Sequence, residues 1–300
     1  MYDITIVGAG PAGLSAAITA RARNKSVLVV SNRLENSPLA KAKIIDNYPG
    51  VSKISGRALL EQMQEQALGL GVEFCFERVI SVLPLGERFS LTAGDRLIEA
   101  RSIILATGVS ADAPFPGESE FLGRGVSYCA TCDGMLYRTA KVCVVGLDAE
   151  AVTEANFLAE IGADVSFLAR KAPTGLSEGI AVKLGSVINI TGDMMGVTGL
   201  TYREADTDKT ESITCAGIFI LRPTLAPDTL LAGLELKENS IIVDRGMSTN
   251  IPGVFAAGDC TGKPLQIAKA VGEGQLACFS AIESLGWYQG KPDTTQGTSK

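Results

Sequence analysis

Two closely spaced cysteines are the residues in this sequence best suited to chemistry. Residues 128–134 read YCATCDG, so two residues separate Cys129 from Cys132, and Asp133 follows directly. In disulfide exchange a thiolate is the nucleophile, and a neighbouring thiol can resolve the mixed disulfide that forms. The sequence has no histidine, which makes the Asp133 carboxylate the candidate acid or base for the protons that move with the thiols. The pattern indicates redox chemistry; the structural alternatives are core packing for the cysteines and turn capping for Asp133.

The remaining cysteines do not extend this pair into a metal site or a disulfide framework. A structural zinc site uses about four sulfur or imidazole ligands, usually in two closely spaced pairs. Here there is one such pair and no imidazole, and an odd total of seven cysteines is not typical of a disulfide-stapled secreted domain. We therefore expect no metal site. The other cysteines are scattered, at Cys75, Cys143, Cys215, Cys260 and Cys278.

Composition limits the classes of function. A chain of 300 residues with 46% hydrophobic side chains can bury a full core, in one large domain or two ordinary ones. The formal charge of −6 gives no general attraction to nucleic acid or to an anionic membrane. The sequence shows neither a secretory signal pattern nor an apolar run of about 18 residues. We expect a cytoplasmic protein that binds neither membrane nor nucleic acid.

A glycine-rich turn near the N-terminus predicts a dinucleotide site. Residues 2–31 have the pattern of a strand, a turn, an alanine-rich helix and a second strand, and Gly8, Gly10 and Gly13 have G-x-G-x-x-G spacing. Gly8 would make the turn, Gly10 would let the backbone approach a pyrophosphate, and Gly13 would let the helix pack closely on the strand. The acidic residue often found about 20 residues further on is absent, since Ser31 stands there.

Three later segments complete an α/β organisation. Residues 141–171 repeat the order of strand, turn, helix and strand, which predicts a second nucleotide-type fold. Residues 100–117, ARSIILATGVSADAPFPG, have a strand, an ATG turn and a proline-rich stretch typical of an exit from the first domain. Residues 250–285 predict a strand, a Gly-Asp turn and a long helix.

Four motifs in this order resemble the low-molecular-weight thioredoxin reductase family. They are GAGPAG at 8–13, ATG at 106–108, CATCDG at 129–134 and GVFAAGD at 253–259. The resemblance implies an α/β flavoprotein with two Rossmann-like domains, the second inserted in the first. It implies a discontinuous FAD-binding domain at 1–113 and 241–300, and an inserted domain at 114–240 that carries the redox disulfide.

The resemblance also implies roles for individual residues. Cys129 and Cys132 would exchange electrons with FAD and with a dithiol protein such as thioredoxin, Asp133 would be the acid or base, and the protein would be a homodimer. The implied FAD-binding residues are Gly8, Gly10, Pro11, Ala12 and Gly13 at the pyrophosphate, Asn47, Thr107 and Gly108 along the flavin, Gly258 and Asp259 at the ribityl chain or phosphates, and Gln266, Ile267 and Ala268 near the isoalloxazine ring.

The second nucleotide fold departs from the family pattern for NADPH. A working site would show a G-G-G-x-x-A turn, but here Gly146 is followed by Leu147 and Asp148. Asp148 would add bulk and a negative charge where a pyrophosphate should lie. Of the basic residues expected after the next strand, Arg170 and Lys171 are present. The chain thus resembles the relatives that do not use NADPH.

Several electron partners stay open at this point. One is ferredoxin, for which Arg21, Arg23 and Lys25 with Lys41 and Lys43 offer candidate positive charges. Another is a second flavin in place of NADPH, against which the aromatic pair Trp287 and Tyr288 could stack or, alternatively, simply anchor the last helix. A conventional NADPH-dependent reductase with drifted motifs and a flavin-bound redox sensor without turnover are the rival functions. The direction of electron flow is also open.

Overall fold

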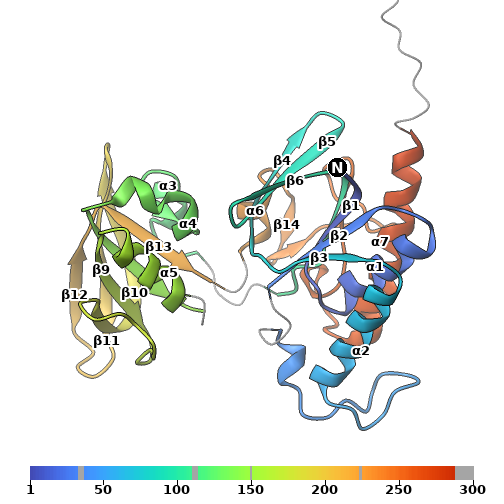
Figure 1. The fold of residues 1–300 in the computed structure, drawn as a ribbon, viewed down its shortest axis with the longest axis horizontal. Coiled ribbons are helices and arrows are strands. Elements are labelled where there is room, and N and C mark those ends of the chain that lie inside the picture. Colours follow the sequence, from blue (N-terminus) through green and yellow to red (C-terminus); the bar gives the residue numbers. More distant parts are fainter. Residues whose placement is uncertain (33–36, 110–113, 149–150, 223–224, 288–300) are drawn as a thin grey trace, which may run out of the picture. The chain divides into compact units, whose positions relative to one another are not determined.

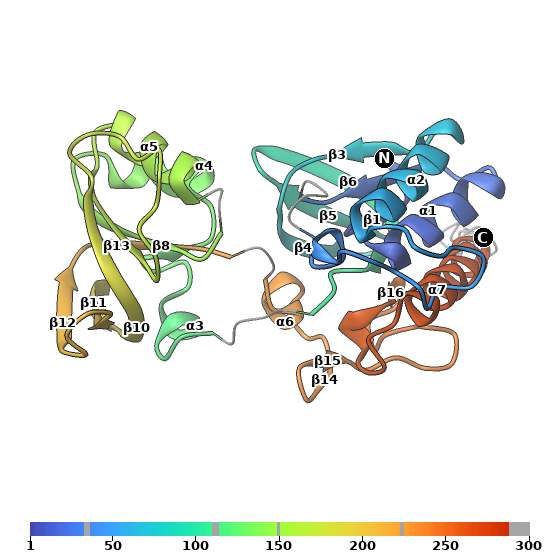
Figure 2. The same ribbon diagram turned by 90° about the horizontal axis from the view of Figure 1, so that it is seen from below.

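The computed structural model describes residues 1–32, 37–109, 114–148, 151–222 and 225–287. The chain divides into two compact units (Figures 1 and 2). Unit 1 comprises Met1–Ser110 and Ala226–Lys300, and unit 2 comprises Ala111–Leu225. Unit 2 is therefore inserted in unit 1, as the fold class predicted.

The second boundary lies earlier than the sequence suggested. We placed it at 240, but the contacts place it after Leu225. The intervening segment begins with the short helix α6 (Pro227–Leu230), and Leu230, Leu231 and Leu234 lie in the same core as strands of unit 1. These apolar side chains can be buried only against unit 1, so the segment belongs there.

Unit 1 is built on a seven-stranded mixed sheet in the order β3-β2-β1-β6-β5-β4, with β16 also pairing with β6. Strands β3, β2, β1, β6 and β16 run parallel, whereas β4, β5 and β6 form an antiparallel meander. The parallel strands are runs of valine, isoleucine and leucine, as expected for strands covered on both faces. Their bounds are β1 (Tyr2–Val7), β2 (Val27–Val30), β3 (Glu73–Cys75), β4 (Val79–Leu85), β5 (Arg88–Ala93), β6 (Arg96–Leu105) and β16 (Val254–Ala256).

Three helices pack together beside the parallel strands: α1 (Pro11–Ala22), α2 (Gly56–Gly69) and α7 (Ile267–Trp287). Small side chains let α1 and α7 approach closely, because buried alanines lie on both helices. Helix α7 comes from the far end of the chain, so this contact ties the two ends together. The remaining elements of unit 1 are η2 (Leu39–Lys41), β14 (Leu236–Lys237), β15 (Ser240–Ile241) and η4 (Asp259–Thr261).

Unit 2 has its own seven-stranded sheet, in the order β12-β11-β10-β9-β8-β13-β7. The expected second nucleotide-type fold is present: β8 and β9 pair in parallel and α5 connects them. The elements are α3 (Glu118–Phe121), β7 (Val126–Ser127), α4 (Ala130–Asp133), η3 (Gly134–Tyr137), β8 (Lys141–Gly146), α5 (Ala151–Glu160), β9 (Asp164–Ala169), β10 (Ala181–Asp193), β11 (Gly196–Glu204), β12 (Thr210–Thr214) and β13 (Gly217–Leu221).

Neither unit offers a membrane-spanning element in its described part. Among the described residues, no helix combines the length and the apolar character that crossing a bilayer requires.

A buried ion pair joins the first and last segments of unit 2. Arg222 donates to both carboxylate oxygens of Glu118, through Nη2 to Oε2 at 2.8 Å and through Nη1 to Oε1. The Tyr128 hydroxyl donates to Glu118 Oε1 at 2.9 Å, and the Phe115 amide donates to Oε2 at 2.7 Å. Glu118 is fully buried. Since Tyr128 directly precedes Cys129, the ion pair also fixes the segment that leads into the redox motif.

We predict that Arg222→Met strongly destabilises unit 2. Removal of the guanidinium leaves the Glu118 carboxylate buried without its counter-charge, which should cost about 3–5 kcal/mol of unfolding free energy. Hydrogen exchange followed by mass spectrometry would localise the loss to unit 2. The control is Arg170→Met, because Arg170 is exposed and its loss should cost no more than about 0.5 kcal/mol.

A double variant tests the reason for the loss. Glu118→Leu together with Arg222→Met leaves no buried charge and should recover most of the stability lost in Arg222→Met alone. An unchanged stability in Arg222→Met would contradict the assignment.

Candidate active site

Three turns that the sequence singled out meet at one edge of the unit 1 sheet. They follow β1, β6 and β16, which are neighbouring parallel strands with Val7 opposite Leu105 and Leu105 opposite Ala256. The Ala106 amide donates to Val7 O at 2.8 Å, and the Ala257 amide donates to Leu105 O at 2.9 Å. The carboxyl edge of a parallel sheet is where such folds bind nucleotides. The glycine turn, the ATG turn and the Gly-Asp turn therefore border one site.

The first glycine turn has the geometry that a pyrophosphate needs. Gly8 has φ of 112°, and a Cβ there would overlap the carbonyl of Ala106; a Cβ on Gly13 would overlap the carbonyl of Gly8. A Cβ on Gly10, by contrast, would meet nothing within 4 Å. Two glycines thus close the turn and the third faces open space. No side chain caps α1, which starts at Pro11, so its first amides can face an anion.

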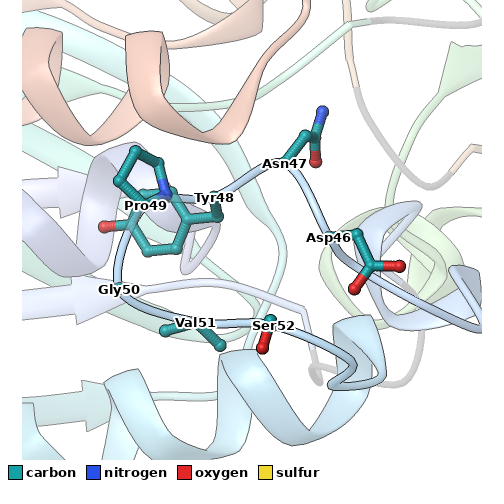
Figure 3. Close-up of a pocket in the computed structure, with 7 residues that line it drawn as sticks. All are labelled: Asp46, Asn47, Tyr48, Pro49, Gly50, Val51 and Ser52. Atoms are coloured by element: carbon teal, nitrogen blue, oxygen red, sulfur yellow. The ribbon is translucent and has the colours of Figure 1, made fainter.

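A loop and the start of α7 form another border of the site. The Asn47 side-chain amide donates to Gln266 Oε1 at 3.0 Å, which brings together two residues far apart in the sequence that the resemblance placed at the flavin. The loop around Asn47 bends back on itself around a hollow of about 530 Å³, lined by residues 46–52 (Figure 3). Ile267 and Ala268 follow in the first turn of α7.

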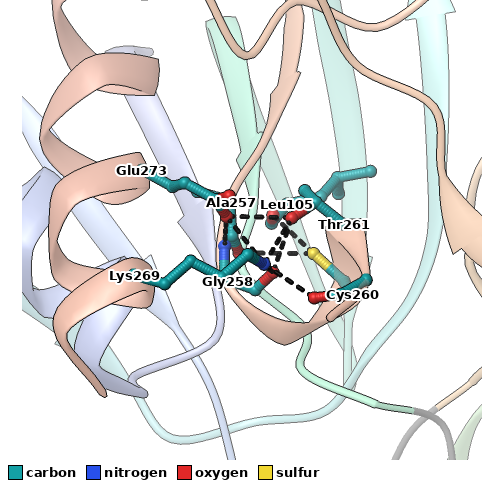
Figure 4. Close-up of polar contacts among 8 residues, drawn as sticks. Leu105, Ala257, Gly258, Cys260, Thr261, Lys269 and Glu273 are labelled. Carbon is teal, nitrogen blue, oxygen red and sulfur yellow. Dashed lines mark hydrogen bonds and ion pairs between the residues drawn. The ribbon is translucent and has the colours of Figure 1, made fainter. Parts of the chain in front are cut away.

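A polar network holds the Gly-Asp turn that carries Asp259 (Figure 4). Lys269 Nζ donates to Gly258 O at 2.9 Å, Gly262 O at 2.7 Å and Thr261 Oγ1 at 2.9 Å. The Glu273 carboxylate accepts from the Gly258 amide at 2.9 Å and lies 3.2 Å from Lys269 Nζ. Lys269 and Glu273 were not predicted from the sequence, although their i, i+4 spacing in a helix is a signal for an ion pair.

The buried and exposed groups along this edge fit a flavin dinucleotide. Thr107 Oγ1 is buried at this edge. Val109 and Leu265, each close in sequence to a predicted flavin residue, are about half exposed, at 52% and 46%. A buried hydroxyl and uncovered apolar side chains suit a ligand that is apolar along its ring and polar at its edges. Thr107, Gly108, Asn47 and Gln266 would hold such a group.

The two cysteines of the motif form a disulfide in unit 2. Cys129 precedes α4 and is buried, with 4% exposure, while Cys132 in α4 is exposed. Cys129 Sγ accepts from the Cys132 amide at 3.1 Å and lies 3.2 Å from Thr131 Oγ1. These donors would stabilise a thiolate on Cys129. The pair thus has one buried and one exposed cysteine.

Asp133 is linked to the same pair through a serine. Asp133 Oδ2 accepts from Ser127 Oγ at 2.6 Å, and Ser127 Oγ accepts from the Cys129 amide at 3.1 Å. Burial raises the pKa of Tyr137, and the negative charge of Asp133 raises it further. Asp133 therefore takes part in a network beside the sulfurs and does more than cap a turn. Ser127 was not predicted, because a serine two residues before a cysteine carries no signal of its own.

The remaining cysteines are unsuited to thiol chemistry. All five are buried, and none is in a disulfide. Burial raises the pKa of Cys260 to about 11 and those of Cys215 and Cys278 to about 12, so these groups stay protonated at neutral pH. Within the described residues, no group of three or more histidine, cysteine or acidic side chains could hold a metal ion.

The second nucleotide fold presents an acidic turn. Asp148 lies two residues after the end of β8, at the carboxyl edge of the unit 2 sheet, and Arg170 and Lys171 are exposed after the neighbouring strand β9. Asp148 therefore lies in the turn between β8 and α5, the part of a nucleotide fold that binds a pyrophosphate in other proteins. The next residues, Ala149 and Glu150, lie outside the described residues, as do Tyr288 and the side chain of Trp287.

The basic residues considered for a ferredoxin surface do not form one patch. Arg21 Nε donates to Leu70 O at 3.1 Å, at the C-terminal end of α2. Lys41 and Lys43 lie at the opposite end, because Ala42 O accepts from the first residue of α2. Helix α2 has 14 residues and is therefore about 21 Å long. The two groups of charge are separated by that length.

Comparison with known proteins agrees with these features. The model of the pyridine nucleotide-disulphide oxidoreductase family matches residues 2–274. A thioredoxin reductase from Treponema pallidum is 34% identical over 302 residues, covering 96% of this chain and 98% of that protein. A ferredoxin-flavin thioredoxin reductase from Clostridium acetobutylicum is 39% identical, with a TM-score of 0.88 over 96% of this chain and 98% of that one. A thioredoxin reductase from Gloeobacter violaceus is 33% identical, with a TM-score of 0.82 over 98% of both chains.

The half-buried Asp259 carboxylate at the Gly-Asp turn yields a pH-dependent prediction. Burial raises the pKa of Asp259, Lys269 lowers it and Glu273 raises it, with a net rise above 3.8. The folded protein thus holds this proton more tightly than the unfolded chain, so ionisation of Asp259 destabilises the fold as the pH rises. In flavin-free protein, Asp259→Asn should raise the melting temperature at neutral pH by a few degrees at most, and the gain should shrink as the pH falls toward 3.8.

The control is Asp95→Asn, on the exposed turn between β5 and β6. It should leave the melting temperature unchanged throughout the range. A gain for Asp259→Asn that is the same at every pH would show that the carboxylate is not the cause.

Proposed function

Because the chain belongs to the pyridine nucleotide-disulphide oxidoreductase family and is a flavoprotein oxidoreductase of the thioredoxin reductase type, acting on a sulfur group, we propose that it reduces thioredoxin with electrons that do not come from NADPH. Two electrons pass between FAD and the Cys129–Cys132 disulfide, and from there to the thioredoxin disulfide. The observation that carries the proposal is a redox pair with one exposed sulfur, one buried sulfur held by donors, and a carboxylate linked to it.

Unit 1 is the proposed FAD domain. Support comes from the three turns at the carboxyl edge of its sheet, the open space before Gly10 and the buried hydroxyl of Thr107. FAD, when bound, supplies the two electrons that convert the disulfide to a dithiol. Gly8, Gly10, Pro11, Ala12 and Gly13 would hold its pyrophosphate, Asn47, Thr107, Gly108, Gln266, Ile267 and Ala268 its ring, and Gly258 and Asp259 its ribityl chain or phosphates.

The chain's own thiols would carry out the exchange with thioredoxin. The exposed Cys132 thiolate attacks one sulfur of the thioredoxin disulfide, a mixed disulfide forms, and the other thioredoxin sulfur leaves as a thiolate and takes up a proton. The Cys129 thiolate then attacks Cys132 Sγ, the Cys129–Cys132 bond forms again, and the second thioredoxin sulfur leaves and is protonated. Two electrons and two protons have moved to thioredoxin. Asp133, linked to the Cys129 amide through Ser127, is placed to accept and return these protons.

The acidic turn of unit 2 argues against NADPH as the donor. Asp148 would bring a carboxylate toward two phosphates, and in a site with little water such a contact costs several kcal/mol. The likeness to a ferredoxin-flavin thioredoxin reductase supports ferredoxin as the donor. Arg170 and Lys171 keep part of a 2′-phosphate site, which favours a conventional NADPH-dependent reductase as the second candidate.

Other features implied by the resemblance stay predictions. They are the homodimer, the cytoplasmic location and a second flavin in place of NADPH.

The source of electrons is tested by anaerobic mixing of the purified yellow protein with possible donors. We expect NADPH to leave the flavin absorbance nearly unchanged, because Asp148 opposes its pyrophosphate, and reduced ferredoxin to bleach it and to sustain thioredoxin reduction. Fast bleaching by NADPH would establish the conventional reductase instead. If reduced ferredoxin bleaches the flavin but thioredoxin is not reduced, the protein would be a flavin-bound redox sensor. Two flavins per chain in a denatured extract would mean that a second flavin, and not ferredoxin, is the electron partner of FAD.

The role of the exposed sulfur is tested by Cys132→Ser. This variant should lose thioredoxin reduction by at least about 1000-fold, since no thiolate remains to attack, and should keep its full flavin content. Cys75→Ser is the control, because Cys75 is buried away from the pair and its loss should leave the exchange intact. Full activity in Cys132→Ser would mean that the pair is structural.

A further inference from the structure

A second carboxylate contacts the redox motif from a different helix. Glu154, in the first turn of α5, accepts a hydrogen bond from the Ala130 amide at 2.8 Å. Ala130 lies between the two cysteines and follows Cys129 directly. No role for Glu154 follows from the motif itself, because 24 residues separate the two partners of this bond.

Packing fixes this carboxylate relative to the sulfurs. Ala130 is fully buried and shares a core with Ala151 and Ala155 of α5. A Cβ at Gly134 would lie 2.9 Å from Leu158 of the same helix. Helices α4 and α5 therefore meet at a close contact that leaves little room for either to shift. This packing holds the hydrogen bond between Glu154 and Ala130 in place.

The contact affects the reduced pair in two ways. First, it occupies an amide donor that could otherwise point toward a thiolate on Cys129. Second, it places a negative charge near the sulfur: the Ala130 nitrogen is a few covalent bonds from Cys129 Sγ, so the carboxylate lies within a Debye length, about 8 Å at physiological ionic strength. Asp133 is the other acidic group at the pair. Both effects of Glu154 oppose a thiolate and favour the disulfide.

We propose that Glu154 sets the reduction potential of the Cys129–Cys132 disulfide, holding it more negative, and so more strongly reducing, than the motif alone would. This inference rests on the proposed function, because it assumes that the pair cycles between disulfide and dithiol. In that cycle the bond between the two sulfurs breaks and two electrons enter. Each sulfur also takes up a proton, except in the fraction of molecules in which that sulfur stays a thiolate. Destabilising that thiolate makes reduction less favourable and the dithiol a better donor to thioredoxin.

The test is the equilibrium between the full-length protein and dithiothreitol redox buffers. In these buffers the two thiols of dithiothreitol are oxidised to its cyclic disulfide as the protein disulfide is reduced. Maleimide trapping and mass spectrometry then give the reduced fraction of Cys129 and Cys132. Glu154→Gln keeps a carbonyl oxygen for the Ala130 amide and removes only the charge. We expect its equilibrium constant to move about tenfold toward the dithiol, equal to about 30 mV more positive.

Two further variants separate charge from fold. Glu160→Gln removes the same charge from the same helix at an exposed position, and we expect no shift in its equilibrium constant. Glu154→Ala also frees the Ala130 amide and should shift in the same direction as Glu154→Gln, by a larger factor. Cys132 of both Glu154 variants, once reduced, should be alkylated by iodoacetamide at an unchanged or higher rate at neutral pH.

The outcomes are distinct from those that test the proposed function. A pair that stays oxidised in every buffer would defeat the proposed function and this inference with it. A pair that titrates normally, with Glu154→Gln equal to the natural protein or to Glu160→Gln, would overturn the role of Glu154 alone. A shift of Glu154→Gln toward the disulfide would overturn it as well, because the sign would be opposite to that of a negative charge.

Discussion

The close approach of backbone segments at the carboxyl edge of the unit 1 sheet is the constraint on which the proposed cofactor site depends. The α carbon of Gly8 lies so near the carbonyl of Ala106 that no side chain fits, and Gly13 stands in the same relation to Gly8. The far end of the chain obeys the same rule, since a Cβ at Gly274 of α7 would overlap the carbonyl of Ala12. Glycine at these positions lets β1, β6, α1 and α7 converge, and the ends of the chain form one site although unit 2 is inserted between them.

Charge is distributed differently at the two candidate centres. At the Gly-Asp turn of unit 1, Lys269 neutralises Glu273 and satisfies the carbonyls of the turn, so the backbone around Asp259 is held while that carboxylate stays available. At the redox pair of unit 2 two carboxylates, Asp133 and Glu154, lie beside the motif. An acidic surrounding of this kind suits a dithiol that gives electrons away.

The inserted unit has the architecture of a nucleotide fold, but its turn between β8 and α5 is acidic. Strands β8 and β9 and helix α5 have the expected order and pairing, but the turn between β8 and α5 carries Asp148. In this unit the helix that would otherwise face a nucleotide packs against α4 and contacts the redox motif through Glu154. The fold thus serves to position a disulfide, which is consistent with an electron source other than NADPH.

The sequence by itself determined the elements and the motifs, because glycine spacing, apolar runs and the cysteine pair act over short stretches of chain. It predicted both βαβ units and the Gly-Asp turn with its long helix, whereas the insertion of one fold in the other was implied by the family resemblance. Only the tertiary structure decided which residues meet across long separations. It joined Asn47 to Gln266 and Glu118 to Arg222, assigned residues 226–240 to unit 1, and put the two basic groups at opposite ends of α2. Such contacts depend on strand order and helix packing, and a local pattern of residues does not encode them.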